Sequence, residues 1–389
     1  MEENNSLYQI DTATNTIFDR VRKYIDQKYK LRYNSIALEF EIRNDDSKWT
    51  ELNINSLYIE LTKAGINTTI SKLEILLRSH LVLTYNPLSD YFSNLPKWNG
   101  QDEIKKLASY VRTTDDAFFL NHFEKWLTRT VVCALKSGYI NKQCLVLFNT
   151  RQNSGKTSFL RFLIPGDLSR YYTEDISVDK DGLIALCKNL IVNIDELAVM
   201  SKTDVNILKS FISKNTVNTR MPYDRKTSLM QRTSSFCGST NRFDFLTDET
   251  GSVRWQIFEV LEIDFNYSKE VNIDHVWAQA FYNAFERKNF NAELTAEDIR
   301  ENEKRNERYN LVSMEHEILL THFEKSDSTE EFLTPTDIML AMQNALGVRL
   351  NVSRIGRALT AMKFERIKHS KRQVYGYLIR RKDYELEKD

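Results

Sequence analysis

The 389-residue sequence is poor in the residues and runs that mark several protein classes. It has 11 glycines and 5 prolines, too few for collagen-like or proline-rich architectures. No apolar run approaches the roughly 20 residues needed to span a bilayer. The first ten residues are polar and acidic and lack a signal-peptide pattern. We therefore expect a cytoplasmic protein that does not contact a membrane.

Cysteine is scarce and scattered. The four cysteines lie far apart in apolar surroundings, at Cys133, Cys144, Cys187 and Cys237. The sequence has no CxxC pair and no Cys/His cluster with the spacing of a zinc site. We expect four buried thiols in a reducing compartment.

An excess of charge is also absent, because 54 Lys and Arg balance 54 Asp and Glu. This balance excludes a globally basic surface, so any contact with nucleic acid must come from local patches. Hydrophobic residues make up 41% of the chain, enough for a buried core. The length fits two or three domains.

Periodicity and turn residues divide the chain into five segments. Residues 1–86 are predicted to form a mainly helical module with one strand pair, and the alternation of Ile36, Leu38 and Phe40 indicates a strand there. Residues 87–140 form a helical lead-in. Over 141–265, short apolar runs alternate with helical stretches, which predicts an α/β core with a largely parallel sheet. A helical connector over 266–328 leads to a terminal unit at 329–389.

The most informative segment is a strand, a polar loop and an apolar-periodic helix over residues 145–163. Residues 150–157 match the phosphate-loop pattern G-x-x-x-x-G-K-[ST] except that Thr150 replaces the first glycine. Thr150 must then take a conformation that glycine takes more readily. Gly155 lets backbone N–H groups face phosphate oxygens, Lys156 reaches the β- and γ-phosphates, and Thr157 offers a hydroxyl to Mg²⁺. The alternative is a chance GKT before a helix. The predicted ATP-binding residues are Thr150, Arg151, Gln152, Asn153, Ser154, Gly155, Lys156, Thr157 and Ser158.

Two further apolar runs end in polar residues that such a site needs. The first delivers Asp195 and Glu196 to the carboxyl edge of the sheet, where ligands bind in open α/β folds. We expect Asp195 to hold Mg²⁺ with Thr157, and Glu196 to act as general base toward the attacking water. The second run ends at Asn241, which would orient that water. The alternative is a strand that merely ends in acidic residues.

In this order, these segments resemble the virulence-associated E family, which comprises superfamily 3 helicase-type AAA+ ATPases of phages, plasmids and integrated islands. The likeness includes DYFSNLPKWNG at 90–100 and FLTDETGSVRW at 245–255, and it covers about residues 87–262. It implies that residues 141–265 are an AAA+ core that binds ATP and Mg²⁺. It also implies a ring-forming DNA helicase or translocase, a hexamer, that hydrolyses ATP during replication of a phage, plasmid or genomic island.

The resemblance places a β-hairpin between the strand that ends at Asp195 and Glu196 and the strand that ends at Asn241. Its arms would be residues 216–221 and 228–231. Arg225 and Lys226 at the tip would contact the phosphates of single-stranded DNA in the pore of the ring. A solvated basic loop is the alternative.

Arg254 resembles an arginine finger, which completes the ATP site of a neighbouring subunit and stabilises charge on the transferred phosphoryl group. Arg232 is a second candidate for contact with phosphate or with the neighbour. The alternative for Arg254 is a surface arginine paired with an acidic residue such as Asp248.

Residues 334–380 are predicted to form two helices and two strands in the order of a winged helix. Between residues 346 and 382 there are eleven basic residues and one acidic residue. Arg354 and Arg357 on the second helix, with Lys371 and Arg372 in the wing, would face duplex DNA. The alternative is a module used for packing or subunit contact.

Two other functions remain open. One is a DNA-binding initiator or regulator that uses ATP only as an assembly switch, and the other is an anti-phage ATPase. Residues 1–86 are a candidate collar for subunit assembly or a contact for a primase or polymerase.

Overall fold

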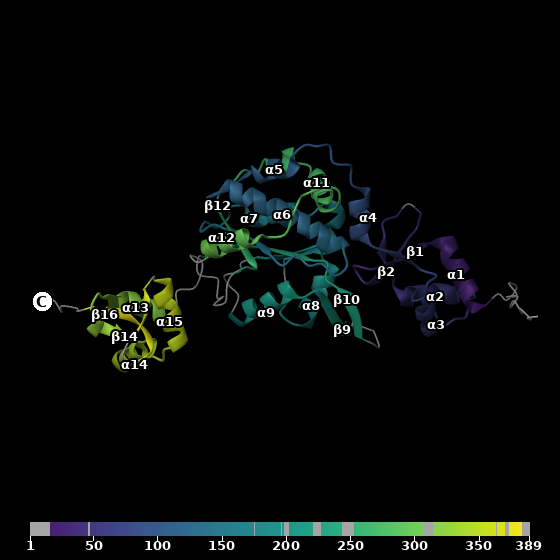
Figure 1. Ribbon diagram of the computed structural model, residues 1–389. Coiled ribbons are helices and arrows are strands. Elements are labelled where there is room, and N and C mark those ends of the chain that lie inside the picture. Colours follow the sequence, from purple (N-terminus) through teal and green to yellow (C-terminus); the bar gives the residue numbers. More distant parts are fainter. Residues whose placement is uncertain are drawn as a thin grey trace, which may run out of the picture. The chain divides into compact units, whose positions relative to one another are not determined.

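The computed structural model describes residues 16–45, 47–174, 176–195, 197, 202–220, 227–242, 253–306, 314–362, 364–369 and 373–382 (Figure 1). The chain forms two compact units. The first takes in residues 1–242 and 249–307, and the second takes in residues 243–248 and 308–389. In the described part of the chain, no helix combines the length and apolar character that crossing a membrane requires.

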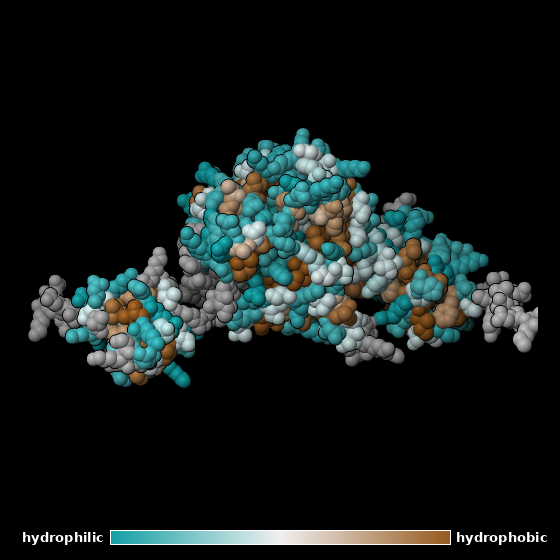
Figure 2. All heavy atoms as spheres, viewed as in Figure 1, coloured by the Kyte–Doolittle hydropathy of each residue, from teal (hydrophilic) through white to brown (hydrophobic). Residues whose placement is uncertain are grey.

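The N-terminal module combines three helices with a small sheet, so it contains more strand than the sequence indicated. Its helices pack around a core that includes Leu57, Leu61 and Leu73. Hydrophobic residues also reach the surface of this module (Figure 2). The helices are α1 (Ile17–Lys28), α2 (Ile54–Lys63) and α3 (Ile70–Leu77). The sheet has the order β3-β2-β1-β4, with β1 (Lys30–Asn34), β2 (Glu39–Arg43), β3 (Thr50–Glu51) and β4 (Leu83–Tyr85).

The strand predicted over Ile36, Leu38 and Phe40 is wrong in its position. Residues 35–38 form the turn between β1 and β2, in which Leu38 has a φ of 62°. The side-chain oxygen of Asn34 accepts hydrogen bonds from the backbone N–H groups of Ile36 and Ala37. This local bond offers the backbone an alternative to a strand ladder.

The lead-in is helical as predicted, with one short strand at its centre. Its elements are α4 (Pro87–Asn94), α5 (Glu103–Ala108), β5 (Val111–Thr113) and α6 (Asp116–Leu135). Helix α6 packs on the central sheet, because Trp126 is fully buried and its indole N–H donates to the carbonyl of Phe236 at 3.1 Å.

The predicted α/β core is confirmed. Its six-stranded sheet has the order β5-β12-β6-β11-β8-β7, and every neighbouring pair is parallel except β5 with β12. Its strands beyond β5 are β6 (Cys144–Phe148), β7 (Tyr172–Thr173), β8 (Ile191–Ile194), β11 (Ser235–Thr240) and β12 (Trp255–Ile263). Strands β6, β8 and β11 are buried along their whole length, which is why each reads as a continuous apolar or small-residue run.

Helices cover both faces of this sheet (Figure 1). Helices α6, α7 and α11 lie on one face, and α8 and α9 on the other. A hairpin of β9 and β10 follows α9. The bounds are α7 (Lys156–Phe162), α8 (Lys180–Lys188), α9 (Lys202–Ser213), β9 (Thr216–Arg220), β10 (Thr227–Gln231), α10 (Tyr267–Glu270), α11 (Ile273–Phe285) and α12 (Ala296–Asn306). The four cysteines are free and buried, as predicted.

The second unit has its own core, built around Leu319, Ile338, Met342, Leu359 and Ile379. Its elements are α13 (Met314–His322), β13 (Phe323–Lys325), β14 (Phe332–Leu333), α14 (Pro335–Leu346), α15 (Val352–Ala361), β15 (Arg366–Lys368) and β16 (Tyr375–Arg381). In this unit α14 and α15 are consecutive along the chain, and the strand pair β15–β16 follows them. Strand β16 pairs antiparallel with β13, β14 and β15.

Candidate nucleotide site

The predicted phosphate loop, residues 149–155, joins the carboxyl end of β6 to the start of α7. The side chain of Asn149 fixes the start of this loop. Its amide donates to the carbonyl of Val260 at 2.7 Å, and its oxygen accepts from the backbone N–H of Arg151 at 2.6 Å. The loop is therefore tied to β12, the strand beside β6.

The loop's left-handed backbone lies at Asn153 and Gly155, not at Thr150. Gly155 has a φ of 84° and Asn153 a φ of 54°, and asparagine tolerates this region better than most residues. Thr150 is absent from the described non-glycine residues with positive φ. The strain expected from replacing the first glycine with Thr150 is therefore not present.

Lys156 lies within the loop. Its ammonium group donates to the carbonyls of Asn149 (3.1 Å) and Arg151 (3.2 Å) and to the hydroxyl of Ser154 (2.9 Å). Only 8% of the residue is exposed. Burial lowers the pKa of Lys156, and the negative charge of Asp195 opposes this shift. Because an ammonium has three donors, Lys156 would exchange at least one of these acceptors for a phosphate oxygen.

Asp195 follows β8 and meets the start of α7. Its Oδ1 accepts hydrogen bonds from the hydroxyls of Thr157 (3.0 Å) and Ser239 (2.5 Å). Ser239 lies next to Asp195 because β11 pairs with β8, and the partner of Ile194 is Gly238. Sequence reasoning missed Ser239. Its only signal was a hydroxyl near the end of a strand, and the register that places it here cannot be read from the sequence.

These groups fit a bound Mg²⁺. This ion prefers oxygen ligands, and it usually takes one or two carboxylates with the rest from phosphates and water. Thr157 and Asp195 supply a hydroxyl and a carboxylate in contact with each other. Among the residues that the structure describes, no group of three or more His, Cys, Asp or Glu could hold a metal ion. Glu196, the predicted general base, lies outside the described residues.

Asn241 follows the last residue of β11, beside the start of the loop. The preceding Thr240 accepts a hydrogen bond from the backbone N–H of Asn149 at 3.2 Å. The carboxyl ends of β6, β8 and β11 therefore bring the loop, Asp195 and Asn241 to one edge of the sheet.

Arg254 lies at the opposite edge. It precedes β12, and its carbonyl accepts from the backbone N–H of Cys144, the first residue of β6. The length of β6 separates it from the loop by about 15 Å at 3.3 Å per residue. Its side chain instead donates through Nε to the hydroxyl of Ser213, the last residue of α9, at 2.9 Å. Arg254 therefore does not reach the loop of its own chain.

The suggestion that Arg232 contacts phosphate or a neighbouring subunit is wrong. Its side chain is fully buried. The guanidinium donates to the backbone carbonyls of Phe211 and Ile212 near the end of α9, and to those of Asn141 and Ser234. Burial lowers the pKa of Arg232. The residue holds the end of α9 in place, where a cation also suits the helix dipole.

The predicted hairpin is present. Strands β9 and β10 pair antiparallel from Thr216 with Gln231 to Arg220 with Thr227. The tip residues Arg225 and Lys226 lie outside the described residues.

The predicted duplex-contacting residues are only partly described. Arg354 is exposed near the start of α15. Arg357 also belongs to α15, but its side chain is not described. Lys371 and Arg372 lie outside the described residues.

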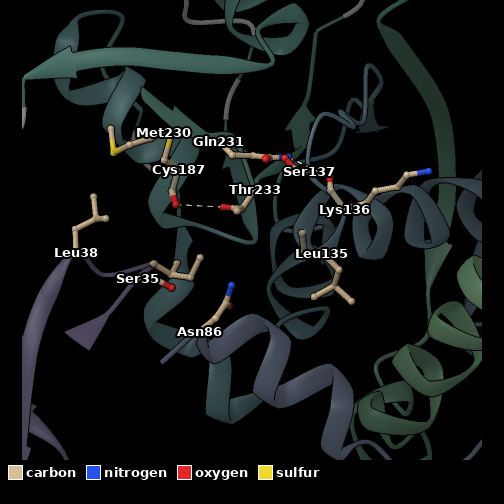
Figure 3. Close-up of a pocket in the computed structure, with 12 residues that line it drawn as sticks. Ser35, Leu38, Asn86, Leu135, Lys136, Ser137, Cys187, Met230, Gln231 and Thr233 are labelled. Carbon is tan, nitrogen blue, oxygen red and sulfur yellow. Dashed lines mark hydrogen bonds between the residues drawn. The ribbon is translucent and has the colours of Figure 1, made fainter. Parts of the chain in front are cut away.

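A pocket in the first unit lies away from the loop (Figure 3). The turn between β1 and β2, the end of α6 and the last residues of β10 surround it. The amide of Gln231 donates to the carbonyl of Lys136 at 3.0 Å, and the hydroxyl of Thr233 donates to that of Cys187 at 3.2 Å. The lining residues are Ser35, Ile36, Leu38, Asn86, Ala134, Leu135, Lys136, Ser137, Cys187, Met230, Gln231 and Thr233. None of these belongs to the predicted nucleotide site.

A family model, the virulence-associated protein E-like domain, matches residues 92–311. No curated protein matches the chain. Solved structures of similar fold include the apo structure of the NrS-1 C-terminal region, residues 305–718 of that protein. It has 13% identity and a TM-score of 0.53, over 94% of this chain and all of that one. An A-form apo structure of the same region has 14% identity and a TM-score of 0.51 with the same coverage.

Proposed function

Because the chain belongs to the virulence-associated protein E-like family, we propose that it is a superfamily 3 helicase-type AAA+ ATPase. In this proposal it forms a ring and acts as a DNA helicase or translocase in replication of a phage, plasmid or genomic island. The observation that carries the proposal is the contact between Thr157 and Asp195 beside the buried Lys156. Lys156 and Thr157 at the start of α7 and Asp195 after β8 come together there, and a triphosphate with Mg²⁺ needs residues of these types.

Each residue of the site has a defined task in hydrolysis. Lys156 and the backbone N–H groups of the loop would bind the triphosphate, and Thr157 with Asp195 would hold Mg²⁺. A bound Mg²⁺ would supply positive charge against the negative charge that develops on the phosphate oxygens. Glu196 takes a proton from the attacking water, and Asn241 orients that water.

The position of Arg254 supports an active unit of more than one subunit. It lies at the edge of the sheet away from its own loop, so an arginine finger at this position would act on the loop of another subunit. An arginine supplied in this way is worth about 10³–10⁵ in rate in well-studied cases. Repetition of such a head-to-tail contact gives a ring when the rotation between subunits closes, and the family resemblance favours a closed hexamer.

The hairpin and the C-terminal unit supply the contacts to DNA in this proposal. Arg225 and Lys226 at the hairpin tip follow the phosphates of single-stranded DNA without reading bases. We assign the C-terminal unit as a winged helix, because α14, α15 and the pair β15–β16 follow in that order. Arg354, Arg357, Lys371 and Arg372 would grip duplex DNA, and the N-terminal module would contact a neighbour, a primase or a polymerase.

The test compares ATP hydrolysis and DNA unwinding by wild type and by Lys156→Ala. We expect single-stranded DNA to stimulate hydrolysis in wild type, and both activities to be lost in Lys156→Ala. Lys180→Ala is the matched control, because Lys180 is an exposed lysine at the start of α8. Unwinding that survives Lys156→Ala would contradict the motor. ATP-dependent assembly on DNA without unwinding by wild type would favour the initiator instead.

A further inference from the structure

An exposed aromatic ring lies against the predicted phosphate loop. Phe265 comes two residues after β12, which runs parallel to β6 and continues past the end of β6 at the same edge of the sheet. A Cβ atom placed on Gly155 would lie 2.7 Å from Cζ of Phe265. The ring therefore packs directly on the bare Cα of Gly155, yet 55% of the residue is exposed.

Phe265 is held in place although its ring is exposed. The backbone carbonyl of Phe265 accepts hydrogen bonds from the backbone N–H (3.2 Å) and the hydroxyl (2.9 Å) of Ser268. The plane of the Phe265 ring lies 29° from that of the Tyr267 ring, with the ring centroids 6.4 Å apart. Tyr267 is buried and packs edge-on against Phe159 and Phe162 of α7. The core therefore positions Phe265 beside the first residues of the helix that begins at Lys156.

A single exposed phenylalanine is ordinary on a protein surface, so exposure alone does not indicate a binding role and the residues around it must be considered. Here the neighbour is the loop proposed to bind a triphosphate, and the base of a nucleotide is a flat aromatic group. We propose that Phe265 is a stacking platform for the base of the nucleoside triphosphate. This inference rests on the proposed nucleotide site and adds the subsite for its base.

The proposed subsite makes a distinction that the loop alone cannot make. The loop binds phosphates, which ATP shares with inorganic tripolyphosphate, whereas a stacking ring adds affinity only for the ligand with a base. Because every base has a π face, stacking does not select adenine, and GTP should gain from Phe265 as ATP does.

The test measures dissociation constants for ATP and for inorganic tripolyphosphate, both with Mg²⁺, by isothermal titration calorimetry on the full chain. We expect Phe265→Ala to weaken ATP binding by about 5- to 150-fold, the usual loss on removing a stacking ring. Its tripolyphosphate binding should match wild type, and Phe265→Trp should bind ATP as wild type does. The matched control is Phe285→Ala at the end of α11, because Phe285 is exposed to a similar extent, 48%, and pairs with Phe281.

Other outcomes would overturn the inference in distinguishable ways. Equal ATP affinity in wild type and Phe265→Ala would remove the base subsite and leave the nucleotide site intact. Equal loss of ATP and tripolyphosphate would show that the ring only supports the loop. A change in particle mass without a change in ATP affinity would make Phe265 a subunit contact. Wild type that binds neither ligand would refute the nucleotide site itself.

Discussion

At the scale of single residues, Ser239 is the hydroxyl that would tune the proposed Mg²⁺ site. It donates to the same oxygen of Asp195 that accepts from Thr157, so it fixes the orientation of the carboxylate. Partners of this kind typically contribute 10- to 100-fold to metal affinity. We predict that Ser239→Ala raises the Mg²⁺ concentration for half-maximal ATP hydrolysis by about 10-fold or more. A Mg²⁺ titration of the ATPase rate measures this.

The control for Ser239→Ala is Ser137→Ala, because Ser137 is exposed just beyond the end of α6. An unchanged Mg²⁺ requirement in Ser239→Ala would mean that Asp195 keeps its orientation without this hydrogen bond.

His122 gives a prediction about pH. It is 1% exposed, its Nδ1 lies 2.8 Å from the amide of Gln256, and its Nε2 lies 3.8 Å from Asp298. Burial lowers its pKa to about 4 despite the charge of Asp298, which also pairs with Lys125. The unfolded chain therefore binds more protons between pH 6.5 and 4, so stability falls as the pH falls through this window, by up to about 3 kcal/mol.

The measurement for His122 is the free energy of unfolding in urea at pH 7 and pH 4.5, for wild type and for His122→Gln. Carboxylates titrate in both proteins, so the difference between their changes in unfolding free energy with pH isolates the contribution of His122. Identical changes would show that His122 does not resist protonation in the folded state.

At the scale of elements, two arginines with different roles form hydrogen bonds to residues at the end of α9. Arg232 donates to carbonyls at the end of α9 from a fully buried position, whereas Arg254 makes one hydrogen bond to Ser213. Removing Arg232 takes away a donor that several backbone carbonyls share, and it opens a cavity. We predict that Arg232→Ala lowers the free energy of unfolding by about 3 kcal/mol or more.

Arg254→Ala should cost only about 1 kcal/mol, because within the described ranges its side chain makes one hydrogen bond, to Ser213. Urea denaturation of both variants measures the difference. Equal costs would mean that Arg254 also supports the fold, and its assignment to a neighbouring site would lose force.

Helix α15 carries the prediction about duplex DNA. Arg354 and Arg357 both belong to it, and a residue that neutralises a phosphate contributes about −0.9 to the slope of log K against log salt. We predict that the double variant Arg354→Ala/Arg357→Ala binds duplex more weakly, with a slope shallower by about 2. Fluorescence anisotropy at several salt concentrations measures both quantities.

The control for this pair is Arg300→Ala, because Arg300 is an exposed arginine on α12 of the other unit. An unchanged salt slope in the double variant would leave α15 as a packing element.

Elements that are buried and regular were readable from the sequence, and local exceptions were not. The run over β6 is wholly buried between parallel strands, so hydrophobicity alone marks it, and the loop motif after it fixes where it ends. The turn at residues 35–38 was missed because the hydrogen bonds of Asn34 override an alternating pattern. Arg232 was misjudged because its carbonyl partners lie far along the chain, and only the fold brings them together.

For the whole molecule, the account depends on a nucleotide site that one chain cannot complete. The loop, Thr157 and Asp195 lie at one edge of the central sheet, and Arg254 lies at the other. A neighbour that presents its own Arg254 would complete the site, and every subunit would then have two different interfaces. This head-to-tail relation is what allows a ring to close.

The most direct test mixes two inactive variants, Lys156→Ala and Arg254→Ala, and measures ATP hydrolysis. A Lys156→Ala subunit still offers its Arg254 to a neighbour, and an Arg254→Ala subunit still has an intact loop. Random mixing in equal amounts should make about one quarter of the sites complete, so the mixture regains about that fraction of wild-type activity. A mixture that assembles but stays as inactive as either variant alone would contradict a site shared between subunits.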